Sequence, residues 1–279
     1  MRTPMLGSRL VVNGALILTS IYFLFPVWWL IVSATKSNAD LFATNGLWFA
    51  EPHLADNVQA VLSRGAGLFP RWLLNSVGYS LAAALGATVT SAACGYALAK
   101  FRFLGDRVLF GAVIAGLLIP GALLTVPLYL VAASVGLTNT IWSVIIPSIV
   151  SPFGVFLARV YIEGSVPDEV IESARMDGAS ELRIFGQIAV PMLTPALATI
   201  ALFSFVGTWN SFMLPLIMLS NQKLYPVTLG LYAWQSYKGE STYNLVLAGS
   251  LLMVIPLIIG FLLLQKYLRK GLTLGAVKG

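Results

Sequence analysis

The sequence is poor in charge, histidine and cysteine. Its 279 residues include 11 acidic and 17 basic side chains, so 10% are charged, whereas a soluble domain carries about 25%. Hydrophobic residues make up 58% and the mean hydropathy is +0.85, which excludes an ordinary water-soluble core. The single cysteine, Cys94, excludes an internal disulfide, and the single histidine, His53, has no second histidine or cysteine with which to bind a metal. We therefore expect a membrane protein with no catalytic residues and no metal site.

Charge is absent from five long runs of the sequence, at residues 10–35, 72–99, 108–158, 184–222 and 241–265. A helix needs about 20 apolar residues to cross a membrane. The run 108–158 is long enough for two spans, with a turn at 134–140, where Gly136 and Asn139 favour a loop. The sequence therefore predicts an all-α polytopic membrane protein, one transmembrane domain over residues 1–279, with spans at about 10–33, 72–99, 108–133, 140–159, 190–219 and 243–265.

The placement of lysine and arginine predicts the orientation of these spans. With the N-terminus inside, 12 of the 17 basic residues fall on the cytoplasmic side and five outside, as the positive-inside rule requires. Both termini and the loop at 165–190, between the fourth and fifth spans, are then cytoplasmic, and the one long external segment is 36–71. The net charge of +6 reflects this bias rather than nucleic-acid binding, because no basic segment is interleaved with exposed aromatic residues.

Small residues and prolines indicate how the spans pack and bend. The second span carries two stripes of small side chains, Gly78, Ala82, Gly86 and Cys94, and Ala83, Ala87, Ser91 and Gly95. Such stripes let helices approach closely in lipid, either within the chain or against another subunit. Prolines are expected to break or bend the spans where neighbouring groups satisfy the freed carbonyls, and they lie at Pro120, Pro127, Pro147, Pro152, Pro195, Pro215 and Pro256.

The loop at 165–190 is the most informative segment, because it is charged while its flanks are apolar. Pro167 suits the first position of a helix, and the acidic residues after it favour the helix dipole. Gly178 accepts the left-handed conformation that ends a helix, and Ser180 begins a second helix that runs to Pro191. The sequence predicts a short helix, a tight turn and a second helix, a rigid protrusion that can hold a soluble partner and transmit force.

This loop resembles the EAA loop of ABC-importer membrane subunits, which reads E-A-A, three residues, G, nine residues, I, one residue, L and P. Two positions depart from that pattern, because Ser173 replaces alanine and Val190 replaces leucine. The matching residues are Glu172, Ala174, Gly178, Ile188 and Pro191. The likeness continues through LYPVTLGLYAW (224–234) to the C-terminus, and most of the chain is similar to the smaller, six-span permease of carbohydrate importers of the maltose/maltodextrin type.

The resemblance implies a transport subunit rather than an enzyme. It would form a translocation pathway for a di- or oligosaccharide with a second, homologous permease, by alternating access, in a bacterial-type cytoplasmic membrane. Two ATPase subunits would bind ATP and magnesium, this chain would hold no cofactor, and an extracytoplasmic sugar-binding protein would deliver the substrate. The first helix of the loop, a coupling helix between spans four and five, would contact the ATPase through Glu172, Ala174, Asp177 and Gly178.

Polar residues inside the spans are candidates for the substrate pathway. Trp209, Asn210 and Ser211 follow one another in the fifth span, directly after Thr208 in the same polar cluster. An amide there can pair with sugar hydroxyls and an aromatic ring can stack on a sugar face. Looser candidates are Asn75, Tyr129 and Trp142. All of these residues equally suit interhelical hydrogen bonds and interfacial aromatic belts.

Other functions remain open at this point. An ABC permease for glycerol phosphate or phosphodiesters, for polyamines or for amino acids would carry the same loop. An ion-coupled secondary carrier usually buries ionisable residues in its spans, which the five charge-free runs lack. A membrane-embedded enzyme would need a nucleophile–base pair or a metal cluster.

Overall fold

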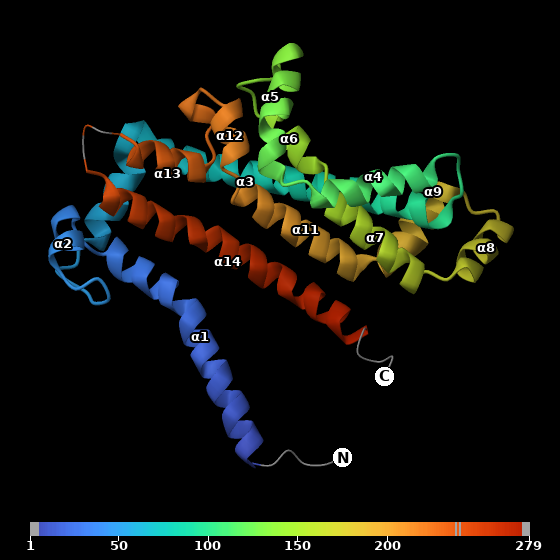
Figure 1. The fold of residues 1–279 in the computed structure, drawn as a ribbon, viewed down its shortest axis with the longest axis horizontal. Coiled ribbons are helices and arrows are strands. Elements are labelled where there is room, and N and C mark those ends of the chain that lie inside the picture. Colours follow the sequence, from blue (N-terminus) through green and yellow to red (C-terminus); the bar gives the residue numbers. More distant parts are fainter. Residues whose placement is uncertain (1–5, 238, 240, 275–279) are drawn as a thin grey trace. The chain divides into compact units, whose positions relative to one another are not determined.

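A computed structural model describes residues 6–237, 239 and 241–274 (Figure 1). Every regular element in these ranges is helical, which confirms the predicted all-α class. The two ends of the chain, whose orientation the sequence predicts, lie outside the described residues. The α-helices are α1 (Leu6–Ala34), α2 (Asn38–Ala43), α3 (Leu54–Lys100), α4 (Asp106–Leu118), α5 (Thr125–Ser134), α6 (Trp142–Ile149), α7 (Pro152–Ser165), α8 (Asp168–Met176), α9 (Glu181–Ile184), α10 (Val190–Met192), α11 (Thr194–Trp209), α12 (Met213–Met218), α13 (Val227–Gln235) and α14 (Tyr243–Leu274). Two 3₁₀ turns, η1 (Gly121–Leu124) and η3 (Gln222–Leu224), and one π-helical turn, η2 (Phe185–Ala189), complete the set.

Four stretches of helix are long and apolar enough to cross a membrane: Leu10–Ala34, Leu54–Lys100, Trp142–Ser165 and Tyr243–Leu263. Two further pairs of helices pass the same test only when taken together. They are Asp106–Leu118 with Gly121–Ser134, bent by 105°, and Glu181–Met192 with Thr194–Trp209, bent by 80°. The described part of the chain therefore has four candidate spans, or up to six if each bent pair is one span.

Three predicted spans differ from the continuous helices that the sequence suggested. The helix predicted at 108–133 breaks before Pro120, and the one at 140–159 stops at Ile149 and resumes at Pro152. The helix predicted at 190–219 bends beside Pro195 and ends at Trp209, so that α12 is a separate element. Proline has no backbone N–H and its ring clashes with the preceding turn, which is why the breaks fall at three of the prolines singled out in the sequence.

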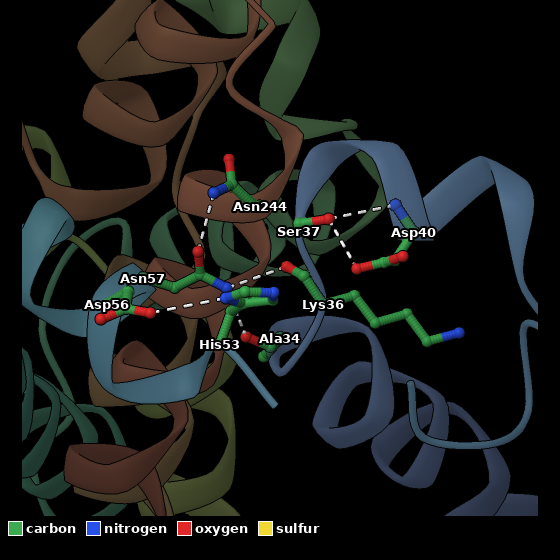
Figure 2. Close-up of polar contacts among 8 residues, drawn as sticks. All are labelled: Ala34, Lys36, Ser37, Asp40, His53, Asp56, Asn57 and Asn244. Carbon is green, nitrogen blue, oxygen red and sulfur yellow. Dashed lines mark hydrogen bonds and ion pairs between the residues drawn. The ribbon is translucent and has the colours of Figure 1, made fainter. Parts of the chain in front are cut away.

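Residues 1–70 and 231–255 form one compact unit, of which residues 1–5, 238 and 240 are not described. Asn57 lies at its polar centre (Figure 2). The Asn57 side chain is 3% exposed, and its Nδ2 donates to the carbonyl oxygens of Ala34, at 3.0 Å, and Lys36, at 2.9 Å. Its Oδ1 accepts a hydrogen bond of 2.7 Å from Nδ2 of Asn244. One asparagine of α3 thereby joins the end of α1 to the start of α14.

The segment 36–71, predicted as a long external loop, is largely helical in this unit. Ser37 caps α2, because its Oγ accepts a hydrogen bond from the Asp40 backbone N–H at 3.2 Å and donates to Oδ2 of Asp40 at 2.6 Å (Figure 2). The Lys36 side chain extends away from Asn57, is 1% exposed, and donates from Nζ to Oγ1 of Thr44 (2.9 Å) and to the carbonyl of Asn45 (2.6 Å). The cap favours α2, and the segment also holds the start of α3 from Leu54, where composition suggested a loop.

Residues 71–230 and 256–279 form the second compact unit, of which residues 275–279 are not described. Within it, one small-residue stripe of α3 packs against α7. Ala83, Ala87 and Ser91 are fully buried, and a Cβ on Gly95 would lie 2.7 Å from Cβ of Ala158. The predicted close helix packing is therefore confirmed within the chain for this stripe. The other stripe, from Gly78 to Cys94, is not buried at its two ends, because Gly78 and Cys94 are exposed.

The turn between α5 and α6 is fastened to the segment that follows α12. The backbone N–H of Asn139 donates to the carbonyl of Met218 at 2.8 Å, and its Oδ1 accepts hydrogen bonds from the N–H groups of Ser220 (3.0 Å) and Asn221 (2.9 Å). Asn139 has a positive φ of 56°, a conformation that asparagine tolerates better than most residues. The turn predicted at 134–140 is confirmed.

Candidate functional site

The charged loop at 165–190 folds as a helix–turn–helix. α8 ends in a Schellman arrangement, in which the Ala179 N–H donates to the carbonyl of Ala174 and the Gly178 N–H donates to that of Arg175, both at 3.0 Å. Gly178 has φ +78°, the left-handed conformation that glycine adopts without strain. α9 begins after Ser180 and continues through η2 and α10. The helix, the glycine turn and the second helix predicted from the sequence are confirmed in form.

The inner face of this loop is built into the core of the second unit. Ile171 and Ala174 of α8 are buried, as is Ile184 of α9. They pack in one hydrophobic cluster with residues of α3, α7, η2 and the segment before α11, namely Tyr96, Ile162, Val166, Ala189 and Leu193. The loop is therefore a rigid extension of the helix bundle rather than a solvated connection.

Lys100, the last residue of α3, fastens the start of α8. Its side chain is 7% exposed, and Nζ donates to the carbonyl of Val166 at 2.6 Å and to Oδ1 of Asp168 at 2.5 Å. The hydrogen bond from Lys100, together with its charge, holds the pKa of Asp168 below its ordinary value. A depressed pKa means that the carboxylate stabilises the fold at neutral pH and stops doing so as the pH falls through its folded pKa, below about 4.

A second ion pair closes the turn at Gly178. Nε of Arg175 donates to Oε1 of Glu181 at 2.6 Å, and a second guanidinium nitrogen donates to Oε2 at 3.3 Å. The guanidinium carbon also lies 5.9 Å from the centre of the Phe101 ring, within cation–π range. The hydrogen bond to Glu181 raises the pKa of Arg175. The two helices of the loop are therefore joined by side chains as well as by the backbone turn.

The outer face of the loop combines exposed apolar and acidic side chains. Met176 is 87% exposed and Leu182 is 83% exposed, although the loop lies outside the long apolar runs. Three of the four residues predicted to contact an ATPase, Glu172, Asp177 and Gly178, are exposed around them. The fourth, Ala174, is 9% exposed and faces the core. A hollow of about 200 Å³ beside Glu172 is lined by Lys100, Arg102, Asp168 and Arg175.

The structure separates the three residues predicted for the substrate pathway. Trp209 is fully buried, with its ring stacked on Phe205 at 5.8 Å between centroids. Asn210 is exposed, and its backbone N–H continues the helix by donating to the carbonyl of Val206 at 3.0 Å. Ser211 lines a hollow of about 380 Å³ between α11 and the break that separates α6 from α7, and neither Trp209 nor Asn210 is among the residues that line it.

The looser pathway candidates are distributed elsewhere. Nδ2 of Asn75 donates to the carbonyls of Lys223 (2.9 Å) and Tyr225 (3.0 Å), so it holds a loop in place. Trp142 is 52% exposed at the start of α6, and Tyr129 packs against a hydrophobic cluster. Thr208, which precedes Trp209 in the predicted cluster, also lines the 380 Å³ hollow. Reasoning from the sequence missed its remaining residues, although a Ser-Pro pair at 151–152 in the middle of a charge-free run is a signal for a helix break.

Comparison with known proteins places the chain among transport proteins. A family described as binding-protein-dependent transport system inner membrane component matches residues 72–274. The arabinooligosaccharides transport system permease protein AraQ of Halalkalibacterium halodurans is 33% identical, over 99% of this chain and 98% of that protein. The trehalose transport system permease protein SugB of Mycobacterium tuberculosis is 30% identical, over 98% of this chain and 100% of that protein.

A solved structure shares the fold. In the crystal structure of a bacterial ABC transporter involved in the import of the acidic polysaccharide alginate, one chain aligns with a TM-score of 0.79. The alignment covers 96% of this chain and 99% of that chain, at 23% identity. At this identity the likeness describes the fold alone.

Proposed function

Because the chain belongs to the family of binding-protein-dependent transport system inner membrane components, we propose that it is the permease subunit of an ATP-driven importer of di- or oligosaccharides. Members of the family are transport subunits, so the chain is a membrane permease and not an enzyme. Relatives named for arabinooligosaccharides, diacetylchitobiose and trehalose support a sugar as the substrate.

In this proposal the chain is one transmembrane domain in a bacterial-type cytoplasmic membrane. The two bent helix pairs each count as one span, which gives six, and both termini and the charged loop lie in the cytoplasm. A second, homologous permease completes the translocation pathway, and an extracytoplasmic sugar-binding protein delivers the substrate. Two ATPase subunits bind ATP and magnesium, and their closure drives alternating access.

The observation that carries the proposal is the exposed apolar tip on a rigid loop. Met176 and Leu182 are more than four-fifths exposed, outside the apolar spans, and exposed apolar groups of this kind mark protein interaction sites. Full burial of one such side chain contributes roughly 1.5–3 kcal/mol. The acidic side chains of Glu172 and Asp177 beside this tip favour a partner cleft with basic or N–H groups.

The inner face of the same loop gives a route for motion into the spans. A displacement of α8 moves Ile171 and Ala174, which pack against Ile162 of α7 and Tyr96 of α3. Lys100 adds a direct polar link from α3 to the start of α8. Because packed cores shift as units rather than deform continuously, a partner that moves α8 moves the helices behind it.

Substitution at the tip tests the proposal. We expect that Met176→Glu and Glu172→Lys abolish co-purification with the ATPase subunit in mild detergent and abolish sugar uptake, while membrane insertion is unchanged. Met176→Leu is the matched control, because it keeps the apolar surface, and it should retain both co-purification with the ATPase subunit and sugar uptake. Full uptake in Met176→Glu and Glu172→Lys would remove the docking role of the loop. If no ATPase co-purifies with the unmodified chain, an ion-coupled secondary carrier becomes the better interpretation.

A further inference from the structure

Two helix interruptions meet at the 380 Å³ hollow of the second unit. α6 ends at Ile149 and α7 begins at Pro152, and the residues between them are extended, with φ/ψ of −80°/112° at Val150 and −127°/92° at Ser151. α11 ends at Trp209, and α12 begins only at Met213. The residues that line the hollow come from both interrupted regions. Discontinuous helices of this kind form the substrate sites of many membrane transporters.

The interrupted backbone cannot face lipid. Non-helical backbone at membrane depth is tolerated only where protein buries it or where it lines a water-filled cavity, because lipid offers its N–H and C=O groups no partner. Val150 lies in the middle of the candidate span Trp142–Ser165, yet it is 72% exposed in this chain. This side of the hollow must therefore face water or a second protein subunit.

The lining of the hollow combines hydroxyl groups with aromatic rings. Phe153 and Phe203 lie 5.4 Å apart between ring centroids, inclined at 55°, and are 39% and 60% exposed. The hydroxyls come from both interrupted regions and include Ser148, Ser151, Ser204 and Ser211. Oγ of Ser148 donates to the carbonyl of Val144 at 2.7 Å, and Oγ of Ser151 accepts from the N–H of Gly154 at 3.0 Å. Each of these two oxygens keeps capacity for a further hydrogen bond, since a hydroxyl has one donor and two acceptor positions.

We propose that this serine–phenylalanine hollow is a sugar-binding site on the translocation pathway, open on the side that the second permease completes. The inference rests on the proposed function, and it adds the residues that hold the substrate and the class of substrate they accept. The volume falls in the range of about 300–1,000 Å³ that is typical of small-molecule sites, where aromatic walls carry a few placed polar groups. The hydroxyls of a sugar pair with the serines, and its apolar faces rest on the phenylalanine rings.

The hollow favours an uncharged substrate. None of its nine lining residues is charged, so a phosphate group brought there would meet no opposite charge from the lining of this chain while it lost its hydration. Glycerol phosphate and glycerol phosphodiesters, which the sequence alone leaves open as substrates, are therefore poor ligands for this site. A neutral saccharide needs only the hydrogen bonds that the serines supply.

Cysteine labelling tests this site. Cys94 is the single cysteine of the chain, so Cys94→Ser gives a background in which Ser204→Cys is the only thiol of this subunit. The complete transporter, made by co-expression with its partner subunits and reconstituted in proteoliposomes, is treated with a charged, hydrophilic thiol reagent. Labelling is measured with arabinotriose, trehalose, diacetylchitobiose or glycerol 3-phosphate present, each in parallel. Phe261→Cys is the control, because Phe261 is 51% exposed and does not line this site. It lines a neighbouring apolar hollow that shares only Phe203 with the site.

We expect Ser204→Cys to react, and at least one of the three sugars to slow its labelling by about tenfold, while glycerol 3-phosphate has no effect. Phe261→Cys should stay unlabelled throughout. An unreactive Ser204→Cys, labelling that no transported sugar slows, or protection by glycerol 3-phosphate alone would each overturn the site. If the transporter takes up sugar in these cases, only the site is wrong. If no ATPase assembles with the chain, both the proposed site and the proposed function are wrong.

Substitution of Phe203 gives a second readout that does not depend on a cysteine. Phe203→Ala should raise the sugar concentration that gives half-maximal uptake by roughly tenfold, the effect of losing one aromatic contact. Phe203→Tyr keeps the ring and should restore the original value, and Phe261→Ala should leave it unchanged. A rise of the same size in Phe261→Ala, or none in Phe203→Ala, would contradict the assignment of the ring to the sugar.

Discussion

Gly178 offers the sharpest prediction about the charged loop. Its φ is +78°, and a Cβ added there would meet nothing within 4 Å. Within this chain, a substitution at Gly178 therefore introduces no clash with neighbouring atoms, and its cost to the fold of the loop is the backbone conformation alone. For an ordinary L-residue that cost is about 1–2 kcal/mol, which lowers the ratio of ordered to disordered loop roughly 5–30-fold. Asparagine tolerates the left-handed region, whereas the β-branched side chain of valine resists it most.

Sugar uptake should therefore be highest in the unmodified chain, lower in Gly178→Asn, lower again in Gly178→Ala and lowest in Gly178→Val. The assay is initial uptake and ATP hydrolysis by the reconstituted transporter, because a loop that fails to transmit motion lowers the amount of sugar moved per ATP. Limited proteolysis at Arg175 and Arg183, which flank the turn, should increase in the same order as uptake falls. Equal uptake and equal cleavage in Gly178→Val and the unmodified chain would refute the argument that the left-handed turn holds the loop.

Two other contacts give predictions about stability in detergent. Lys100→Met removes the donor to the Val166 carbonyl and should cost about 1.5–3 kcal/mol of stability, measured as a lower Tm. Without Lys100, the Asp168 carboxylate no longer stabilises the fold, so the variant should not lose this contribution as the pH falls below about 4. Asp168→Asn keeps the donor to Val166 and should lower the Tm less, so the opposite order would show that the Lys100–Val166 hydrogen bond is not the main fastening. Asn57→Leu leaves two backbone carbonyls without their donor and should cost about 1–3 kcal/mol, and an unchanged Tm would contradict the central place of Asn57 in the first unit.

The sequence predicts the class, the family and the form of the charged loop. Low charge and long apolar runs indicate membrane helices, and the spacing of Glu172, Gly178 and Pro191 identifies the importer permeases, which the comparisons confirm. The loop can be predicted because its signals are local. Pro167 starts a helix and Gly178 ends it through backbone geometry that each residue imposes on its own neighbours.

The features that the sequence does not reveal depend on contacts between distant residues. The run 190–219 carries no charge and includes a polar cluster at 208–211, but this composition does not show that the helix stops at Trp209, or that Ser211 faces a hollow while Trp209 packs inside. Asn57 is an ordinary polar residue in the sequence, and only its hydrogen bonds with Ala34, Lys36 and Asn244 show that it joins the end of α1 to the start of α14. Lys100 is a topology signal in the sequence, and only its distances to Val166 and Asp168 show that it fastens α8.

The central claim is that the tip of the charged loop docks on an ATPase subunit. Met176→Cys, in the Cys94→Ser background, places the only thiol of the subunit at that tip. In the assembled transporter, we predict that a short bifunctional thiol–amine reagent cross-links this thiol to the ATPase subunit. We also predict that a bulky hydrophilic maleimide labels this thiol more slowly in the assembled transporter than in the isolated chain. If that thiol reacts equally fast in the complex and in the isolated chain, and never joins the ATPase, the docking claim is wrong.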